Sequence, residues 1–234
     1  MHFEEFSDGQ IWIAEYRVQL PLLPIKARMS IIRLDDGKLI LHSPGPIDDI
    51  SAKAIAELGS VAYIIAPGSL HHLHVADAQR RFPQAETYIC PGIDRKIPGL
   101  PFDWILGPRP PAIWRSVIDQ VLIRGNRYVA EVAMLHRRSK TLLLVDSIEN
   151  YTSQTPDVSW QLRMLFKFAL GAWNKARPAP EYRFGWKDVQ AAQRSLQCIL
   201  DWDFEKIILS HGDNIVHNAK AIARSAWTPL LHSL

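Results

Sequence analysis

The sequence predicts an α/β protein in which two sheets are flanked by helices. Its 234 residues, 47% of them apolar, can bury one large core, so we expect a single domain over residues 1–234. Short β-rich segments alternate with amphipathic helical patterns, which is typical of helices that cover a sheet. Both halves of the chain show a sheet-then-helix order. This order favours a two-sheet sandwich, although a single doubly wound sheet would have the same periodicity.

The first half begins as antiparallel sheet, because Asp35-Asp36-Gly37 between two β-rich segments is a strong hairpin signal. In the rest of this half, alternating apolar and polar residues or short apolar segments predict strands, and apolar residues at helical spacing predict helices. In order, we expect strands at 11–16, 29–34 and 38–42, a helix at 48–58, a strand at 61–66, a helix at 73–81 and a strand at 86–90. Frequent prolines over 98–111 predict a loop, with a short strand at 102–106.

The second half repeats this order after three further strands. The expected elements are strands at 114–124, 128–135 and 141–145, a helix at 187–201, a strand at 205–210 and a closing helix at 214–225. Asp188 near the start of the first helix suits the helix dipole, and Asp213 is most simply the N-cap of the last.

Residues 147–180 are predicted to be an insertion that contains an aromatic helix over 158–173. Trp160, Met164, Phe168 and Trp173 form a stripe on this helix. Such a stripe is typical of core packing, but it also suits a lid over a hydrophobic substrate or a contact in a homo-oligomer.

Composition and charge favour a small-molecule substrate, rather than a nucleic acid or a membrane, as the partner of this protein. The 27 basic and 24 acidic residues are spread along the chain, which does not indicate nucleic-acid binding. The longest apolar segment, 158–173, contains Arg163 and Lys167 and is shorter than the ~20 residues that cross a bilayer, so no membrane partner is expected. Residues 1–10 lack the basic start and apolar segment of a secretory signal, and we therefore expect a cytoplasmic protein.

Three groups of metal-ligand side chains directly follow apolar strands. They are His71-His72-Leu73-His74 after the strand at 61–66, Asp146 after 141–145, and His211-Gly212-Asp213 after 205–210. Loops at such strand ends gather at one edge of a sheet, where ligands usually bind. Any one of these residues alone is more often structural, so the shared position carries the prediction. Neutral imidazole and carboxylate together suit zinc, iron or manganese.

The order of these motifs resembles the metallo-β-lactamase-like hydrolase and oxidoreductase superfamily, and in particular a divergent family of unknown function within it. The superfamily carries T-H-x-H-x-D-H, then a strand-borne histidine, a strand ending in aspartate and a strand ending in histidine. Here Pro67 and Ser69 stand where the two early histidines should be, His71 takes the place of the aspartate, and His72 matches the closing histidine. The resemblance extends over residues 11–215 and implies a four-layered αββα sandwich.

The later motifs match in part. Asp146 matches the bridging aspartate and His211 the last histidine, whereas the strand-borne histidine would fall near Arg127 and is absent; Glu131, a few residues on, could substitute for it. In the superfamily the lost residues hold a first metal and the retained ones a second. The resemblance therefore implies one divalent metal, zinc rather than iron or manganese, held by His71, His72, Asp146 and His211.

Two residues have alternative interpretations. His72-Leu73-His74 is itself an H-x-H pair, with Asp77 three residues later, but on a helix positions i and i+2 point about 200° apart, so only one imidazole could face a metal. Glu131 could instead form a salt bridge with Arg127, Arg137 or Arg138. His136, at the end of the same strand, is expected at the surface.

Our leading hypothesis is a metal-dependent hydrolase of a small ester, thioester, amide or phosphoester, with Asp146 or Glu131 as general base. The rival is a non-catalytic member of the fold that binds no metal and acts as a binding or interaction module; the missing H-x-H pair favours it. An iron-dependent oxidoreductase is less supported, because the sequence has no G-x-G-x-x-G motif and no P-loop.

Overall fold

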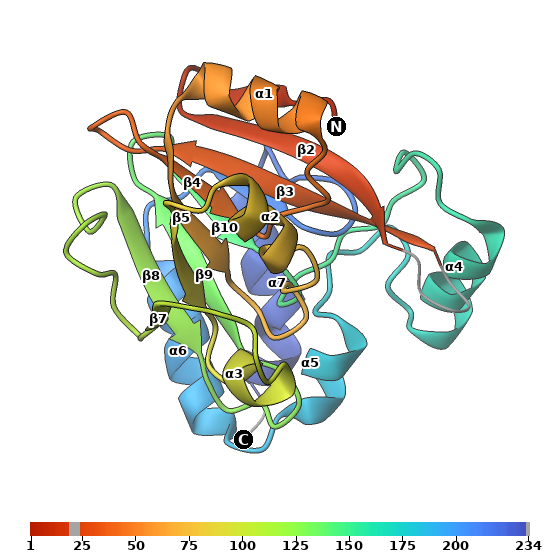
Figure 1. Cartoon of the computed structure of the whole chain (residues 1–234). Coiled ribbons are helices and arrows are strands. Elements are labelled where there is room, and N and C mark those ends of the chain that lie inside the picture. Colours follow the sequence, from red (N-terminus) through yellow and green to blue (C-terminus); the bar gives the residue numbers. More distant parts are fainter. Residues whose placement is uncertain (19–23, 233–234) are drawn as a thin grey trace.

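The computed structural model describes residues 1–18 and 24–232. Within them two mixed sheets lie in the order β1-β2-β3-β4-β5-β6-β7 and β11-β10-β9-β8 (Figure 1). The first sheet consists of β1 (Glu4–Ser7), β2 (Ile11–Val18), β3 (Ile25–Arg33), β4 (Leu39–His42), β5 (Val61–Ala66), β6 (Glu86–Ile89) and β7 (Trp104–Ile105). The second consists of β8 (Ile118–Ile123), β9 (Glu131–His136), β10 (Thr141–Leu144) and β11 (Lys206–Leu209).

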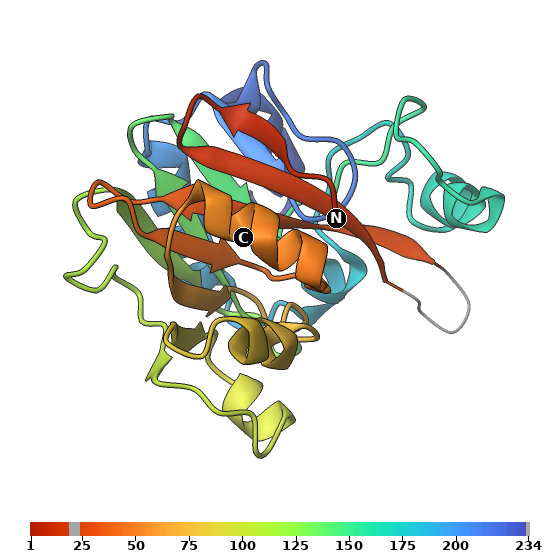
Figure 2. The ribbon, with the colours of Figure 1, turned by 45° about the horizontal axis from the view of Figure 1, so that its top comes forward.

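Helices cover the outer faces of both sheets, as the views in Figures 1 and 2 show. The helical elements of the described residues are α1 (Asp49–Leu58), α2 (Val75–Arg81), α3 (Ile93–Lys96), α4 (Trp160–Met164), the π-helical turn η1 (Leu165–Ala169), α5 (Pro180–Gly185), α6 (Val189–Asp201) and α7 (Ala219–Leu231). The predicted α/β class and the αββα sandwich are therefore confirmed.

The side chains of β9 show why the sheets stack. Val132 and Met134 join the core between the two sheets, while Ala133 and Leu135 join the core beneath α6 and α7. Because successive side chains of a strand point to opposite faces, the four consecutive apolar residues of β9 can contribute to two cores at once. The burial of every β9 residue follows from this central position.

Helix starts agree with the sequence in two cases and differ in one. Asp48 and Asp188 accept hydrogen bonds from the backbone N–H groups of Ser51 and Ala191, and so cap α1 and α6. The prediction that Asp213 caps the last helix is wrong. Backbone bonds between Ile215 and Ile207 keep the chain extended beyond Asp213, so α7 begins only at Ala219.

Two strands are shorter than predicted. The strand expected at 114–124 covers only Ile118–Ile123, because residues 114–117 form a turn. The strand expected at 128–135 begins at Glu131. The expectation of a surface position for His136 is also wrong: its side chain is 1% exposed, and its Nδ1 lies 2.7 Å from Ser139 Oγ.

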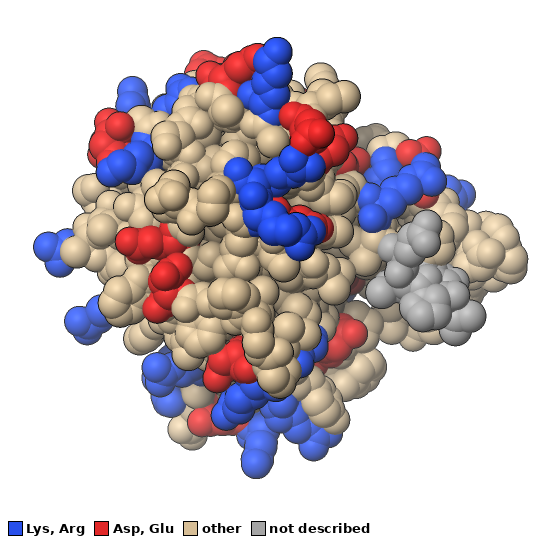
Figure 3. Space-filling model, viewed as in Figure 1, with Lys and Arg blue, Asp and Glu red and all other residues tan. Residues whose placement is uncertain are grey.

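Residues 147–180, the predicted insertion, contain α4 and η1, which project beside the end of β2 and the start of β3 (Figures 1 and 2). In the part of the chain that the structure describes, no helix has the length and apolarity needed to cross a membrane. Basic and acidic side chains are interspersed on the face shown in Figure 3.

We predict that burial of His136 makes the protein less stable in mild acid. Burial lowers the pKa of its imidazole to about 4, below the 6.5 of an exposed histidine. As the pH falls from 6.5 towards 4 the unfolded chain takes up a proton that the folded chain does not, so stability is full above pH 6.5 and declines below it. His136→Gln should remove about 2 to 3 kcal/mol of the stability loss between pH 7 and pH 4.5.

Urea unfolding at the two pH values measures this difference. His217→Gln is the matched control, because His217 is exposed. An unchanged pH dependence in His136→Gln would contradict the assignment.

Candidate metal centre

Parallel pairing of β10 and β11 brings Asp146 and His211 together. Leu144 lies opposite Leu209 in this pair. Asp146 and His211 each follow two residues later, so both leave the sheet at the same edge. This edge is the carboxyl end of the strands, where the sequence placed the site.

His71 reaches the same edge from the first sheet. The loop after β5 is joined to β9 by backbone bonds, from Ser69 N–H to the Ala130 carbonyl at 2.9 Å and from Val132 N–H to the Pro67 carbonyl at 2.7 Å. The Ser69 hydroxyl also accepts the N–H of Ala130. These contacts hold the loop against the second sheet and direct His71 toward Asp146.

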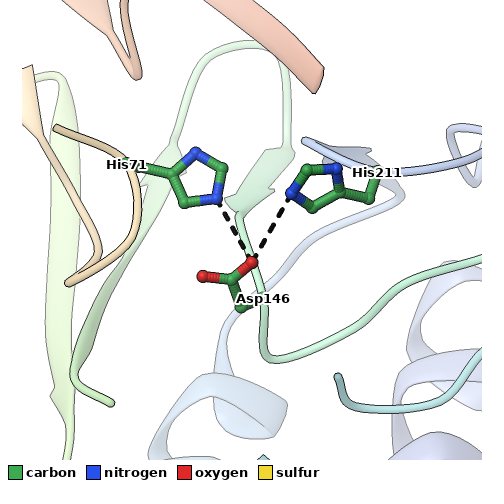
Figure 4. A group of neighbouring side chains, drawn as sticks. All are labelled: His71, Asp146 and His211. Carbon is green, nitrogen blue, oxygen red and sulfur yellow. Dashed lines mark hydrogen bonds and ion pairs between the residues drawn. The ribbon is translucent and has the colours of Figure 1, made fainter. Parts of the chain in front are cut away.

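The three side chains point toward one another (Figure 4). Asp146 Oδ1 lies 3.2 Å from His71 Nε2 and 3.6 Å from His211 Nε2. One ligand atom from each residue lies within 4.8 Å of the others, and all three residues are buried. Two imidazole nitrogens and one carboxylate oxygen form a donor set that suits zinc or iron.

Each imidazole is oriented by a hydrogen bond at its outer nitrogen. His211 Nδ1 donates to the Lys26 carbonyl at 2.8 Å, and His71 Nδ1 lies 2.7 Å from Ser43 Oγ. Metal-ligating histidines in proteins almost always have such a partner at the nitrogen that does not bind the metal.

The protonation state of His211 reveals a conflict at the centre. Burial and the neighbouring His71 lower the pKa of His211 to about 4, so its imidazole is neutral at pH 7. A carbonyl can only accept, so the single proton of the ring is on Nδ1 and Nε2 carries a lone pair. Although burial opposes ionisation of Asp146, the adjacent His71 lowers the pKa of its carboxyl, so the lone pair of His211 faces a carboxylate oxygen. Two acceptors opposed in a buried site are unfavourable unless a cation or a donor lies between them.

Glu131 lies next to the cluster and holds the loop that carries Asp146. Its carboxylate accepts the backbone N–H groups of Val145, Asp146 and Ser147 at 2.7 to 2.9 Å, and the Ser147 hydroxyl at 2.8 Å. The salt bridge with an arginine, considered from the sequence, is therefore wrong. Because both oxygens are occupied, the geometry favours a positioning role over the predicted general-base role.

Arg28 holds the loop that carries His211. Its buried guanidinium donates to the carbonyls of Leu209 and Gly212 and to Asn214 Oδ1. Gly212 itself has a φ of +80°, and a Cβ there would lie 2.3 Å from the Asn150 carbonyl oxygen. The loop conformation therefore requires glycine at this position.

His72 and His74 lie outside the cluster. His72 lines the same cavity as the three candidate ligands, and its Nδ1 is buried without a hydrogen-bond partner. His74 Nδ1 lies 3.1 Å from Asp77 Oδ2. The structure therefore does not bring His72 and His74 together around one metal, and His72 as a fourth ligand stays a prediction.

The cavity has a volume of about 560 Å³ and contains three functional groups that the sequence did not indicate. They are Glu149, Tyr151 and Lys96. Burial and the charge of Asp146 raise the pKa of Glu149 well above its usual range, which favours the protonated form of this carboxyl. Its position three residues after Asp146 could have suggested it. Ser43, the partner of His71, directly follows the strand expected at 38–42, and this position is the signal that could have suggested it.

Solved metallo-β-lactamases share this architecture over almost the whole chain. DIM-1 metallo-β-lactamase superposes with a TM-score of 0.66 at 10% identity, covering 97% of this chain and 96% of that one. The metallo-β-lactamase of Pontibacter korlensis gives 0.65 at 9% identity, with 99% of each chain covered. FIM-1 of Pseudomonas aeruginosa, solved in a mono-zinc form, gives 0.66 at 11% identity, covering 99% and 96%. The chain thus has the metallo-β-lactamase fold, and at these identities the likeness extends to the fold alone.

The family model for DUF4336, a domain of unknown function, matches residues 8–190. The chain belongs to this family, which agrees with the sequence-based resemblance to a divergent family of the superfamily. No curated protein matches the chain in sequence.

We predict that Glu131→Gln destabilises the fold by at least about 3 kcal/mol, because one oxygen with two hydrogen bonds is replaced by an NH₂ group that faces other donors. Ser147→Ala removes one donor from the same carboxylate and should lose about 1 to 2 kcal/mol. Chemical denaturation of the metal-free protein measures both. An equal or smaller loss for Glu131→Gln would show that its carboxylate does not hold the loop.

Proposed function

We propose that this protein is a metal-dependent hydrolase of a small ester, thioester, amide or phosphoester, with one divalent ion held by His71, Asp146 and His211. The observation that carries the proposal is the lone pair of His211 Nε2, which faces the Asp146 carboxylate at 3.6 Å. A cation between these atoms converts an unfavourable contact into two bonds. Zinc is the expected ion, since three protein ligands and an open position are typical of catalytic zinc sites.

A divalent ion bound there would act as a Lewis acid and would lower the pKa of a water molecule toward neutrality. Asp146 directs Oδ1 toward both imidazoles and has Oδ2 with which to accept a proton from the attacking water. Glu149 lines the same cavity, and its raised pKa suits it to give a proton to the leaving group. Glu131 and Arg28 keep the two ligand loops in place.

The rival function, a binding module without a metal, requires a water molecule that donates both its hydrogens to His211 Nε2 and Asp146. Under this alternative a chelator leaves stability unchanged. An iron-dependent oxidoreductase remains the third candidate, because two histidines and one carboxylate also suit ferrous iron. Metal analysis separates all three.

We predict that protein purified without chelator or metal resin holds about one equivalent of zinc. Asp146→Ala and His211→Ala should each weaken zinc binding more than about 100-fold, because even partners of the ligands contribute 10- to 100-fold. Elemental analysis and competition with a chromophoric chelator measure this loss. His217→Ala is the control, since His217 is exposed and six residues from His211. Near-zero metal in the wild-type protein and both ligand variants would refute the proposal, and iron in place of zinc would favour the third candidate.

A second prediction concerns the partner of His71. Ser43→Ala removes the hydrogen bond at His71 Nδ1 and leaves all three ligands, so zinc affinity should fall about 10- to 100-fold. Ser139→Ala removes a comparable hydrogen bond at His136 Nδ1, outside the cavity, and serves as the comparison. Equal zinc affinities in the two variants would show that Ser43 does not orient the imidazole.

A further inference from the structure

The cavity beside the metal centre has one polar end and one apolar end. Its polar end contains the three candidate ligands together with Glu149. The apolar end is formed by one segment of the chain, which comprises α4, η1 and the residue that follows them, and this surface is called the apolar wall. The apolar wall consists of Leu162, Leu165, Phe166 and Leu170. Val18, Ile25 and Ala27 of the β2–β3 hairpin also line the cavity.

The apolar wall is a packed structure. Leu162 and Phe166 are buried together with Tyr151 and Ala172 in a small core of their own. The rings of Phe166 and Tyr151 meet edge to face at 4.5 Å between centroids. The helix also changes at Leu165 from α to π geometry, a change that is frequent at functional sites. The wall is therefore held in place before any ligand binds.

The opposite face of the same segment does not line the cavity. Trp160, Met164 and Phe168 are 70%, 48% and 68% exposed. Neighbouring residues of this segment thus lie either in the cavity lining or on the outer surface. A substitution on the outer surface is therefore a matched control for the same substitution in the lining.

The charges around the cavity do not suit a phosphate group. Asp146 and Glu181 contribute acidic groups to the lining, and Lys96 is the only lysine or arginine among the described lining residues. Lys96 is exposed, and its ammonium group already donates to the Ser69 carbonyl at 3.0 Å. A phosphoester dianion is normally held by several cationic or N–H donors. An uncharged ester, thioester or amide does not need such donors.

We propose that the substrate is an uncharged carboxylic acid derivative with an apolar chain, and that this chain lies along the apolar wall while its carbonyl group lies at His71, Asp146 and His211. The inference rests on the proposed function. In the reaction the single bond between the carbonyl carbon and the leaving atom breaks. Water supplies a hydroxyl group to that carbon and a proton to the alcohol, thiol or amine that leaves.

The first test compares hydrolysis of p-nitrophenyl octanoate, p-nitrophenyl acetate and p-nitrophenyl phosphate by the zinc-loaded protein. Each buried methylene contributes about 0.8 kcal/mol, or about fourfold, so kcat/KM for octanoate should exceed that for acetate by at least about 100-fold. The phosphate should not be cleaved. Equal rates for the two esters, or faster cleavage of the phosphate, would overturn the inference.

Variants on the two faces of the helix sharpen this test. Leu165→Gln should lower the ratio of octanoate to acetate kcat/KM about tenfold, whereas Met164→Gln, one residue away on the exposed face, should leave the ratio unchanged. Leu70→Gln changes another apolar residue of the cavity lining, in the loop after β5, and should also lower the ratio. Leu70 is 37% exposed. An equal effect of Met164→Gln and Leu165→Gln would contradict the assignment of the wall.

A binding measurement separates this inference from the proposed function. Calorimetric titration of the metal-free protein with 1-decanol needs neither metal nor hydrolysis, and Leu165→Gln should weaken this binding about tenfold relative to Met164→Gln. If decanol binds in this manner and neither ester is cleaved, the hydrolase proposal fails and the apolar subsite stands. If decanol does not bind, the subsite assignment fails whatever the hydrolytic activity.

Discussion

The contact between two hydrogen-bond acceptors, His211 Nε2 and the Asp146 carboxylate, is the interaction on which the rest of the candidate metal centre depends. A neutral imidazole whose lone pair faces a buried carboxylate is not stable by itself, and folding brings these groups together from three strand ends. The surrounding framework resists their separation, since Arg28 and Glu131 hold the two loops through main-chain atoms. A cation is the simplest partner that such an arrangement can accept.

Parallel strands explain why the site could be located from the sequence. Asp146 and His211 follow apolar strands at the same distance, so parallel pairing alone aligns them. His71 could be placed for a similar reason, because it follows the buried strand β5. The layered fold was predictable because alternation of strands and helices depends on local patterns. The start of α7 could not be predicted. It depends on the backbone bonds between Ile207 and Ile215, and no local pattern in the sequence reveals that these two residues pair.

The parts of the site that could not be predicted are those that depend on exact side-chain direction. The sequence indicates Glu131 as a substitute for the missing strand-borne histidine, but the four groups that bind its carboxylate lie 14 to 16 residues away along the chain. His71 and His72 are adjacent, and no local pattern distinguishes which of the two imidazoles faces Asp146. The turn of the loop at 67–74, fixed by its bonds to Ala130 and Val132, makes that choice.

The main-chain carbonyl and the side chain of Lys26 make independent contacts with different parts of the structure. Its carbonyl fixes the tautomer of His211, whereas its ammonium group pairs with Glu15 and with Asp157 in the loop that leads to α4. The main-chain oxygen is present whichever amino acid occupies position 26. Mutation there can therefore alter how the loop is fastened to the β2–β3 hairpin while the imidazole keeps its orientation, so the periphery of the cavity can diversify in evolution without disturbing its centre.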